Sequence, residues 1–130
     1  MDDLRALQLK ELELFQAVHD ACEKLGIEYM MHFGTLLGAV RHKGYIPWDD
    51  DIDIVMTWEN FDRFVELAPS VLSENLKIQH WKYEKECPNV FIKVRDANTC
   101  FLQAEHVDLD ICHGIFLDIF PITRIKEDDF

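Results

Sequence analysis

The sequence predicts an α/β (α+β) domain in which a mixed β-sheet is flanked by helices. Residues 4–25 repeat apolar side chains at three- and four-residue steps, as an amphipathic helix does. Several short segments alternate apolar and polar residues with a period of two, and helical segments separate some of them. The 130 residues, of which 48% are hydrophobic, allow a single packed domain spanning residues 1–130. Helices interleaved with strands favour a mixed sheet over a helical bundle or a sandwich.

The first predicted helix covers residues 4–25, and Gly26 stands where a glycine ends a helix. A single helix with an apolar stripe of this length is more typical of a helix that packs on its own domain than of a coiled coil. Residues 27–33 are predicted to form a short strand that leads directly into a helix beginning at Gly34-Thr35. That second helix is expected to run to about His42 and to be closed by Lys43-Gly44.

Residues 51–56 alternate as a strand, with Asp51, Asp53 and Val55 on one face and Ile52, Ile54 and Met56 on the other. Thr57 is expected to cap a third helix, which Pro69 interrupts. Residues 77–81 form the next predicted strand, and residues 83–89 form a charged turn.

Three more strands are predicted to follow. In residues 90–95, Val90, Ile92 and Val94 are predicted to point inward, and a short strand at 100–103 is predicted to pair with this segment. Residues 115–120 place Phe116, Asp118 and Phe120 on one face, and Pro121 is expected to stop the strand.

Composition excludes several classes of function. The net charge of −12 disfavours binding to nucleic acid or to an anionic membrane. No apolar run is long enough to span a bilayer. The four cysteines form no C-x-x-C pair, which argues against a zinc site, and the sequence shows no signal peptide. We therefore expect a cytoplasmic protein without a transmembrane segment.

Four aspartates lie within five residues, at positions 49, 50, 51 and 53. Away from water, the negative charges of these aspartates would repel one another by several kcal/mol. The aspartates therefore need solvent or a cation. The apolar run that follows Asp51 argues against a freely solvated turn. Asp118 is a lone acid within an apolar strand, and an isolated buried carboxylate is costly unless it is paired. If the two strands are neighbours, Asp51, Asp53 and Asp118 form an oxygen cage for one or two divalent cations.

Other interpretations of the acidic residues are weaker. A calcium loop of the EF-hand type starting at Asp49 needs Gly and Glu where Ile54 and Asn60 stand. A solvated acidic turn remains the plain alternative for the aspartate run. A second polar group, at His106, Asp108, Asp110 and His113, is predicted to be surface polarity rather than a metal site. No Ser-His-Asp or Cys-His pattern supports nucleophilic catalysis.

Several residues near the acids are suited to phosphate. A glycine at a strand-to-helix junction permits close approach of a ligand, and the free N–H groups of the new helix suit an anion, which points to Gly34 and Thr35. Arg41 on the same helix is a candidate phosphate ligand, as are Lys93 and Arg95 on one strand face.

The segments from Gly34 to Gly44, from Ile46 to Ile54 and from Gly114 to Pro121 resemble the LicD family, whose members are similar to nucleotidyltransferases of the polymerase-β type. The resemblance implies transfer of a phospho-alcohol, in the first place phosphocholine, from a CDP-activated donor to a cell-surface glycan such as teichoic acid or lipopolysaccharide. It also implies that Asp51, Asp53 and Asp118 are catalytic ligands of Mg²⁺ or Mn²⁺, and that Gly34 and Thr35 lie near the donor phosphates. Contact with a membrane surface would be transient, through the acceptor.

Members of this family are usually longer than this chain, and the C-terminal part usual in them is expected to be missing here. Two alternatives to a transferase therefore stay open. One is a module that binds metal and nucleotide without turnover, and the other is a structural domain that associates through the helix at residues 4–25.

Overall fold

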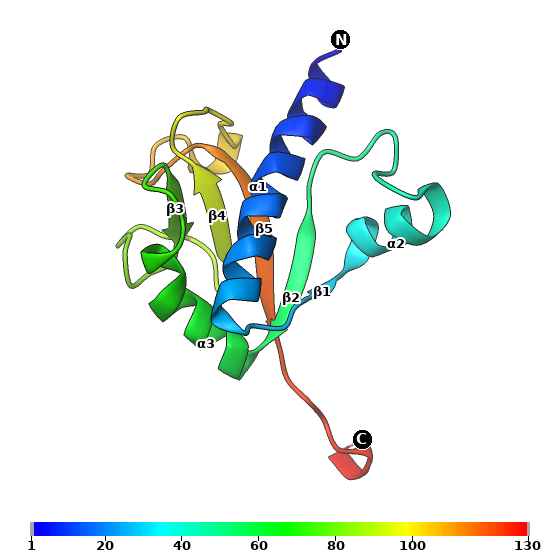
Figure 1. Cartoon of the computed structure of the whole chain (residues 1–130). Coiled ribbons are helices and arrows are strands. Elements are labelled where there is room, and N and C mark those ends of the chain that lie inside the picture. The colour runs from blue at the N-terminus through cyan, green and yellow to red at the C-terminus, as the bar shows by residue number, and fades with distance from the viewer. Residues whose placement is uncertain (1, 130) are drawn as a thin grey trace.

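The computed structural model describes residues 2–129 and contains a five-stranded sheet in the order β1-β2-β5-β4-β3 (Figure 1). The strands are β1 (Met30–Met31), β2 (Asp53–Thr57), β3 (Leu76–Gln79), β4 (Ile92–Asp96) and β5 (Ile115–Ile122). β2 and β5 run parallel, whereas the other three neighbouring pairs are antiparallel. The predicted mixed sheet is therefore confirmed.

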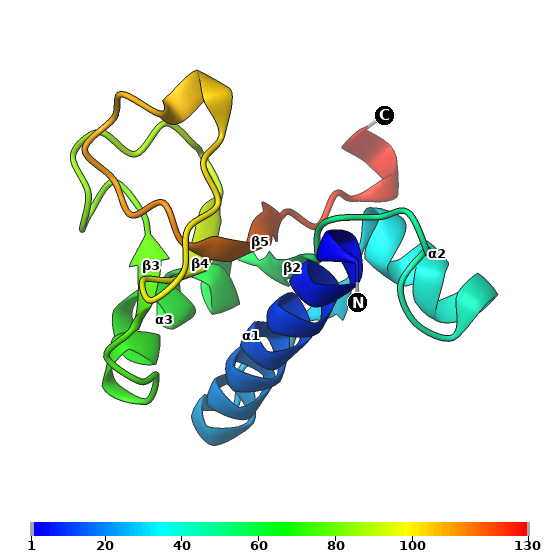
Figure 2. The same cartoon turned by 90° about the horizontal axis from the view of Figure 1, so that it is seen from above.

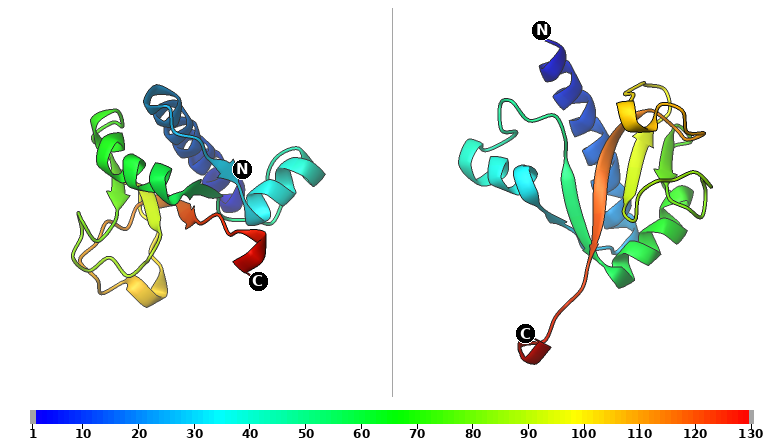
Figure 3. Two further views of the ribbon diagram at one scale, coloured as in Figure 1. Left: turned by 90° about the horizontal axis from the view of Figure 1, so that it is seen from below. Right: turned by 180° about the vertical axis from the view of Figure 1, so that it is seen from behind.

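Three α-helices accompany the sheet: α1 (Asp3–Leu25), α2 (Phe33–His42) and α3 (Trp58–Leu67). Short 3₁₀ helices lie at Ala68–Ser70, Ala104–His106 and Glu127–Asp129. Viewed from above, α1 and α3 lie on the same side of the sheet, and α2 stands beyond the end that carries β1 and β2 (Figure 2). The views from below and from behind agree, and they show the long connection between β4 and β5 on the opposite side from α1 (Figure 3). Within residues 2–129, no helix combines the length and apolarity needed to cross a membrane.

The hydrophobic core fills the space between the sheet, α1 and α3. Of the two faces predicted for residues 51–56, the one that carries Ile52, Ile54 and Met56 points into this core, because all three are at most 3% exposed. Leu117 and Ile119 on β5 point the same way. Since side chains alternate along a strand, the neighbouring residues of β2 and β5 must face the other side of the sheet.

Two helix ends follow the sequence prediction closely. α1 ends at Gly26, which adopts a φ of 63° and whose N–H group reaches the carbonyls of Cys22 and Glu23. Thr57 caps α3, since its hydroxyl accepts a hydrogen bond from the backbone N–H of Asn60 at 3.4 Å. α2 differs in one detail: Lys43, with a φ of 55°, takes the left-handed position, and the following Gly44 donates its N–H to the carbonyl of Gly38.

Several strand predictions need correction. The strand expected at 27–33 is reduced to Met30–Met31, because Phe33 turns the chain with a φ of 46° and begins α2. The strand expected at 100–103 does not form, because both edges of β4 are already occupied by β3 and β5. Val90 does not point inward but is 80% exposed, since β4 begins only at Ile92.

Pro121 does not stop β5, which continues to Ile122 beside the end of β2. The pairing with β4 reaches only as far as Ile119, so beyond that residue β5 has a strand on one side alone. A proline is tolerated there because the hydrogen-bond donor that it lacks is not needed on the open side.

Candidate metal and substrate site

The parallel pairing of β2 with β5 places Asp53 opposite Asp118. Asp51 precedes β2 by two residues, and each of the three carboxyl groups offers an oxygen within 4.8 Å of the others. The sequence prediction that these three acids converge is therefore confirmed. They lie on the face of the sheet opposite the core that α1 and α3 cover, because Ile52 and Ile54 point into that core.

Burial and mutual repulsion both oppose the charged form of these acids. Burial, together with the nearby charge of Asp53, raises the pKa of Asp51 to about 7. Burial, together with the charge of Asp118, raises the pKa of Asp53 to about 6. The pKa of Asp118 is also raised, mainly by burial, against the opposing effect of Lys93. Three hard oxygen donors that repel one another in a half-buried position fit a divalent cation such as Mg²⁺ or Mn²⁺.

Lys93 lies inside this group and is only 4% exposed. Its position opposite Asp118 in the β4–β5 pairing brings its Nζ to 2.6 Å from Asp118 Oδ1. The ammonium also sits 3.7 Å from the ring centroid of Phe116. Burial lowers the pKa of Lys93 in spite of its ion pair. The residue predicted to bind phosphate is thus a partner of a candidate metal ligand, and its contact with phosphate stays a prediction.

Arg95 shares the face of Lys93, as predicted, but it is 1% exposed and its donors are engaged. Its guanidinium donates to the Gly114 carbonyl at 2.7 Å and to the side-chain oxygens of Gln79 and Gln103, each at 3.2 Å. Arg95 therefore ties the long β4–β5 connection to the sheet, and it is not placed to receive a substrate phosphate.

The start of α2 borders the acids. The hydroxyl of Thr35 accepts the backbone N–H of Asp53 at 2.8 Å, which ties the helix to the first residue of β2. Gly34 lies so close to Asp49 that an added Cβ would sit 2.6 Å from its Oδ2. Within the described chain, the N-cap residue His32 makes no side-chain hydrogen bond to the first turn. The amide groups at this helix start therefore remain suited to an anion.

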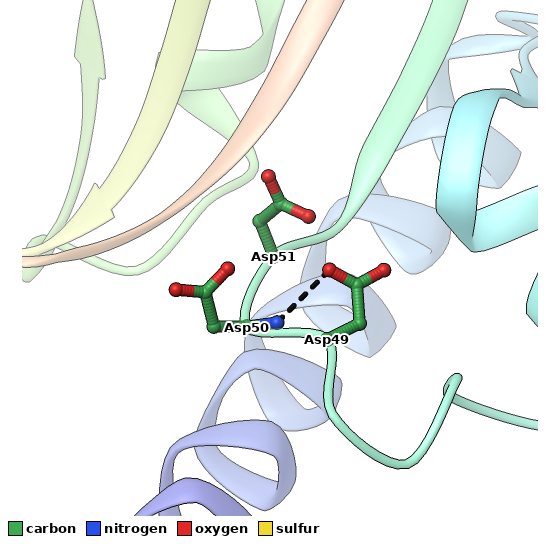
Figure 4. A group of neighbouring side chains, drawn as sticks. All are labelled: Asp49, Asp50 and Asp51. Atoms are coloured by element: carbon green, nitrogen blue, oxygen red, sulfur yellow. Dashed lines mark hydrogen bonds between the residues drawn. The ribbon is translucent and has the colours of Figure 1, made fainter.

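The three consecutive aspartates on the loop before β2 are not equivalent (Figure 4). Asp49 turns back and accepts the backbone N–H of Asp50 at 3.0 Å. The side chain of Asp50 is exposed. Asp51 alone belongs both to this run and to the group with Asp53 and Asp118. The run thus divides into one candidate ligand and two supporting loop residues.

Two other sets of polar residues stand apart. Arg41 lies exposed in the last turn of α2, about 9 Å along the helix from Thr35, so the structure does not gather it with the acids. Its role in phosphate binding stays a prediction. Among residues 2–129, the set at His106, Asp108, Asp110 and His113 forms no group close enough to share a metal ion.

Sequence reasoning missed two supports of the acidic loop, both on α1. Gln8 and Glu11 are each only 3% exposed. The amide of Gln8 donates to the carbonyl of Asp49 at 2.9 Å, and the hydroxyl of Tyr45 donates to Glu11 at 3.0 Å. Gln8 and Glu11 continue the buried stripe of α1 at helical spacing, and that spacing was the signal in the sequence.

Replacing Glu11 with Gln is expected to stabilise the fold above pH 5. Burial, and then the charges of the nearby aspartates, raise the pKa of Glu11 to about 8, although the Tyr45 hydrogen bond opposes the rise. A carboxyl with a raised folded-state pKa binds a proton that the unfolded chain releases, so stability falls as the pH rises from about 4.5 to 8. Gln keeps the acceptor for Tyr45 without this loss.

We expect E11Q to gain about 1–2 kcal/mol over the natural chain at pH 8 and almost nothing at pH 4, as measured by urea denaturation at both values. Glu13 is exposed on the same helix, and E13Q is the matched control, with no such pH-dependent gain. An equal effect of the two substitutions would contradict the account of Glu11.

Comparison with known proteins adds independent information. Residues 26–127 match the family described as LicD/FKTN/FKRP, nucleotidyltransferase domain. A 64-residue stretch, 49% of the chain and 24% of its relative, is 48% identical to the lipopolysaccharide cholinephosphotransferase LicD of Haemophilus influenzae. An uncharacterized protein of Rickettsia typhi is 38% identical over 94% of the chain and 41% of its own length. The human ribitol 5-phosphate transferase FKRP is 31% identical over 82% of the chain and 20% of its own length. The chain thus spans less than half the length of each of these relatives.

Proposed function

The chain belongs to the LicD/FKTN/FKRP nucleotidyltransferase-domain family, and from this premise we propose that it is the core of a metal-dependent phospho-alcohol transferase. The donor in this proposal is a CDP-activated alcohol, CDP-choline in the first place, and the acceptor is a hydroxyl of a cell-surface glycan such as lipopolysaccharide or teichoic acid. The names of the similar LicD and FKRP proteins, a cholinephosphotransferase and a ribitol 5-phosphate transferase, support phospho-alcohol transfer as the class of reaction.

The observation that carries the proposal is the convergence of Asp51, Asp53 and Asp118 beside the start of α2. Three oxygen ligands and a helix N-terminus, side by side, fit a cation and a phosphate respectively. A chain with a net charge of −12 repels a diphosphate unless some local positive charge offsets it. This site would supply that charge.

In this proposal Asp51, Asp53 and Asp118 hold Mg²⁺ or Mn²⁺. The bound ion would supply Lewis-acid stabilisation of the charge that develops as CMP leaves. Thr35 fixes the backbone of Asp53 through its hydroxyl, and Lys93 fixes the carboxylate of Asp118. The uncapped N–H groups around Gly34 and Thr35 would receive donor phosphate oxygens. Holding these groups in place before the donor arrives reduces the reorganisation that the reaction requires.

The direct test is release of CMP from CDP-choline by the purified chain, with phosphocholine transferred to water where no glycan hydroxyl is supplied. We expect release in the presence of Mg²⁺ or Mn²⁺ and its loss when EDTA removes the ion. Metal-dependent binding of CDP-choline without any CMP release would instead favour a module that binds nucleotide without turnover. A chain that binds neither metal nor CDP-choline would contradict both interpretations.

A further inference from the structure

A row of phenylalanine rings lies next to the acids on the same face of the sheet. The rings of Phe91 and Phe120 are 4.4 Å apart and inclined by 33°, so they lie nearly face to face. The ring of Phe33 stands edge-on to Phe120 at 5.7 Å. The row crosses the sheet from the residue before β4, over β5, to the start of α2, and we name Phe33, Phe91 and Phe120 the phenylalanine row.

Strand alternation fixes the position of the row relative to the acids. Phe120 follows Asp118 by two residues on β5, so their side chains leave the same face about 6.5–7 Å apart along the strand. Phe91 precedes Lys93 by two residues in the same way. One level across the sheet therefore contains the paired residues Lys93, Asp118 and Asp53. The phenylalanine row lies at a second level, about one two-residue repeat further along the strands.

Phe33 is held in an unusual conformation. Its φ of 46° is a left-handed value that a bulky residue adopts only at a cost. The side chain gains little burial in exchange, because it is 60% exposed. Packing alone does not account for a strained, exposed aromatic residue, whereas a ligand that covers the ring would.

We propose that the phenylalanine row is the surface on which the pyrimidine base of the nucleotide donor stacks. This inference rests on the proposed function, since it requires a nucleotide whose phosphates lie at the acids. The ribose of a nucleotide separates its phosphates from its base by a length comparable to the spacing between the two levels. The ring of Phe33 is exposed, and those of Phe91 and Phe120 are partly exposed. The ring of His32 lies 4.1 Å from that of Phe33. Aromatic rings accept a flat base by stacking, without specific hydrogen bonds.

The test measures the dissociation constant of CMP in the presence of Mg²⁺ for four variants. F33L and F120L keep apolar volume but remove the ring, and each is expected to weaken CMP binding about tenfold. F33G removes the side chain at a position whose positive φ suits glycine, so it should keep the fold while losing CMP affinity to a similar degree. W58L is the control, because Trp58 is 45% exposed and packs against Phe61 at the start of α3, on the core side of the sheet and away from the row.

A second experiment distinguishes binding of the base from binding of the alcohol. Phosphocholine, which has no base, should bind to F33L and F120L as it binds to the natural chain. With CDP-choline, both variants should raise KM and leave kcat unchanged at saturation. A loss of phosphocholine affinity in place of CMP affinity would overturn the proposal in favour of a surface for the choline ammonium.

Unchanged CMP affinity in F33L and F120L would also overturn the stacking proposal, because the rings would then serve packing alone. This holds even if the melting temperatures of the two variants fall. A natural chain that binds no CMP would overturn it as well. Failure of the proposed function is distinguishable: ring-dependent CMP binding without release of CMP from CDP-choline would support the stacking surface and contradict the transferase.

Discussion

Substitution of Asp53 by Asn is expected to abolish metal-dependent CMP release while making the metal-free chain more stable. Asp53 is the acid between Asp51 and Asp118, so the substitution removes a central ligand and leaves the other two too weak a donor set. A loss of about 10²-fold or more in rate is expected for a residue that acts through a metal. The substitution should keep the native fold, since Asn has nearly the same shape as Asp.

The gain in stability follows from the sign of the pKa shift. The pKa of Asp53 is about 6 in the fold against 3.8 in the unfolded chain, so ionisation at pH 7–8 destabilises the fold. The neutral amide avoids this loss, and with allowance for solvent screening we expect a gain of about 1 kcal/mol in urea denaturation. D50N is the matched control, because Asp50 is exposed and the substitution makes the same chemical change in the same acidic run. Equal activity of D53N and D50N would contradict the assignment of Asp53.

Substitution of Lys93 by Met is expected to give the largest loss of stability among the site residues. Lys93 is buried against Asp118, and its removal leaves three neighbouring carboxyl groups without their counter-charge. Breaking a buried ion pair by removing one partner costs about 3–5 kcal/mol. Millimolar Mg²⁺ should restore part of that loss in K93M and should stabilise the natural chain less, since the ion would replace the missing positive charge.

The measurement is urea denaturation of both proteins with and without Mg²⁺. K82M is the control, because Lys82 forms an exposed ion pair with Glu66 and its loss should leave stability unchanged. If K93M were as stable as K82M, the buried pair would not hold the site together.

The sequence predicted that Asp51, Asp53 and Asp118 lie close together, but it did not predict the contacts of the residues around them. Asp118 could be found because a lone carboxylate within an apolar strand requires a partner, and period two placed Asp51 and Asp53 on one face. Their meeting depended on β5 lying beside β2 in parallel, which two separate segments do not reveal by themselves. The sequence pointed to Lys93 as a phosphate ligand and not as a partner of Asp118, because only the strand register brings the two together.

Gln8 and Glu11 show a different difficulty. Their spacing fits the buried stripe of α1, but polar side chains ordinarily face solvent. They are buried because the loop around Tyr45 and Asp49 offers them hydrogen-bond partners, and those partners lie more than thirty residues away. Local periodicity indicates which side of a helix faces inward, whereas only the tertiary contact explains a polar residue there.

Asp51, Asp53 and Asp118 are proposed to bind one divalent centre. A crystal grown with Mn²⁺ tests this most directly through the anomalous signal of the metal. We expect a peak within about 2.2 Å of carboxylate oxygens from Asp53 and Asp118, with Asp51 also in reach. A peak held only by Asp49 and Asp50, or no peak at millimolar Mn²⁺, would contradict the account.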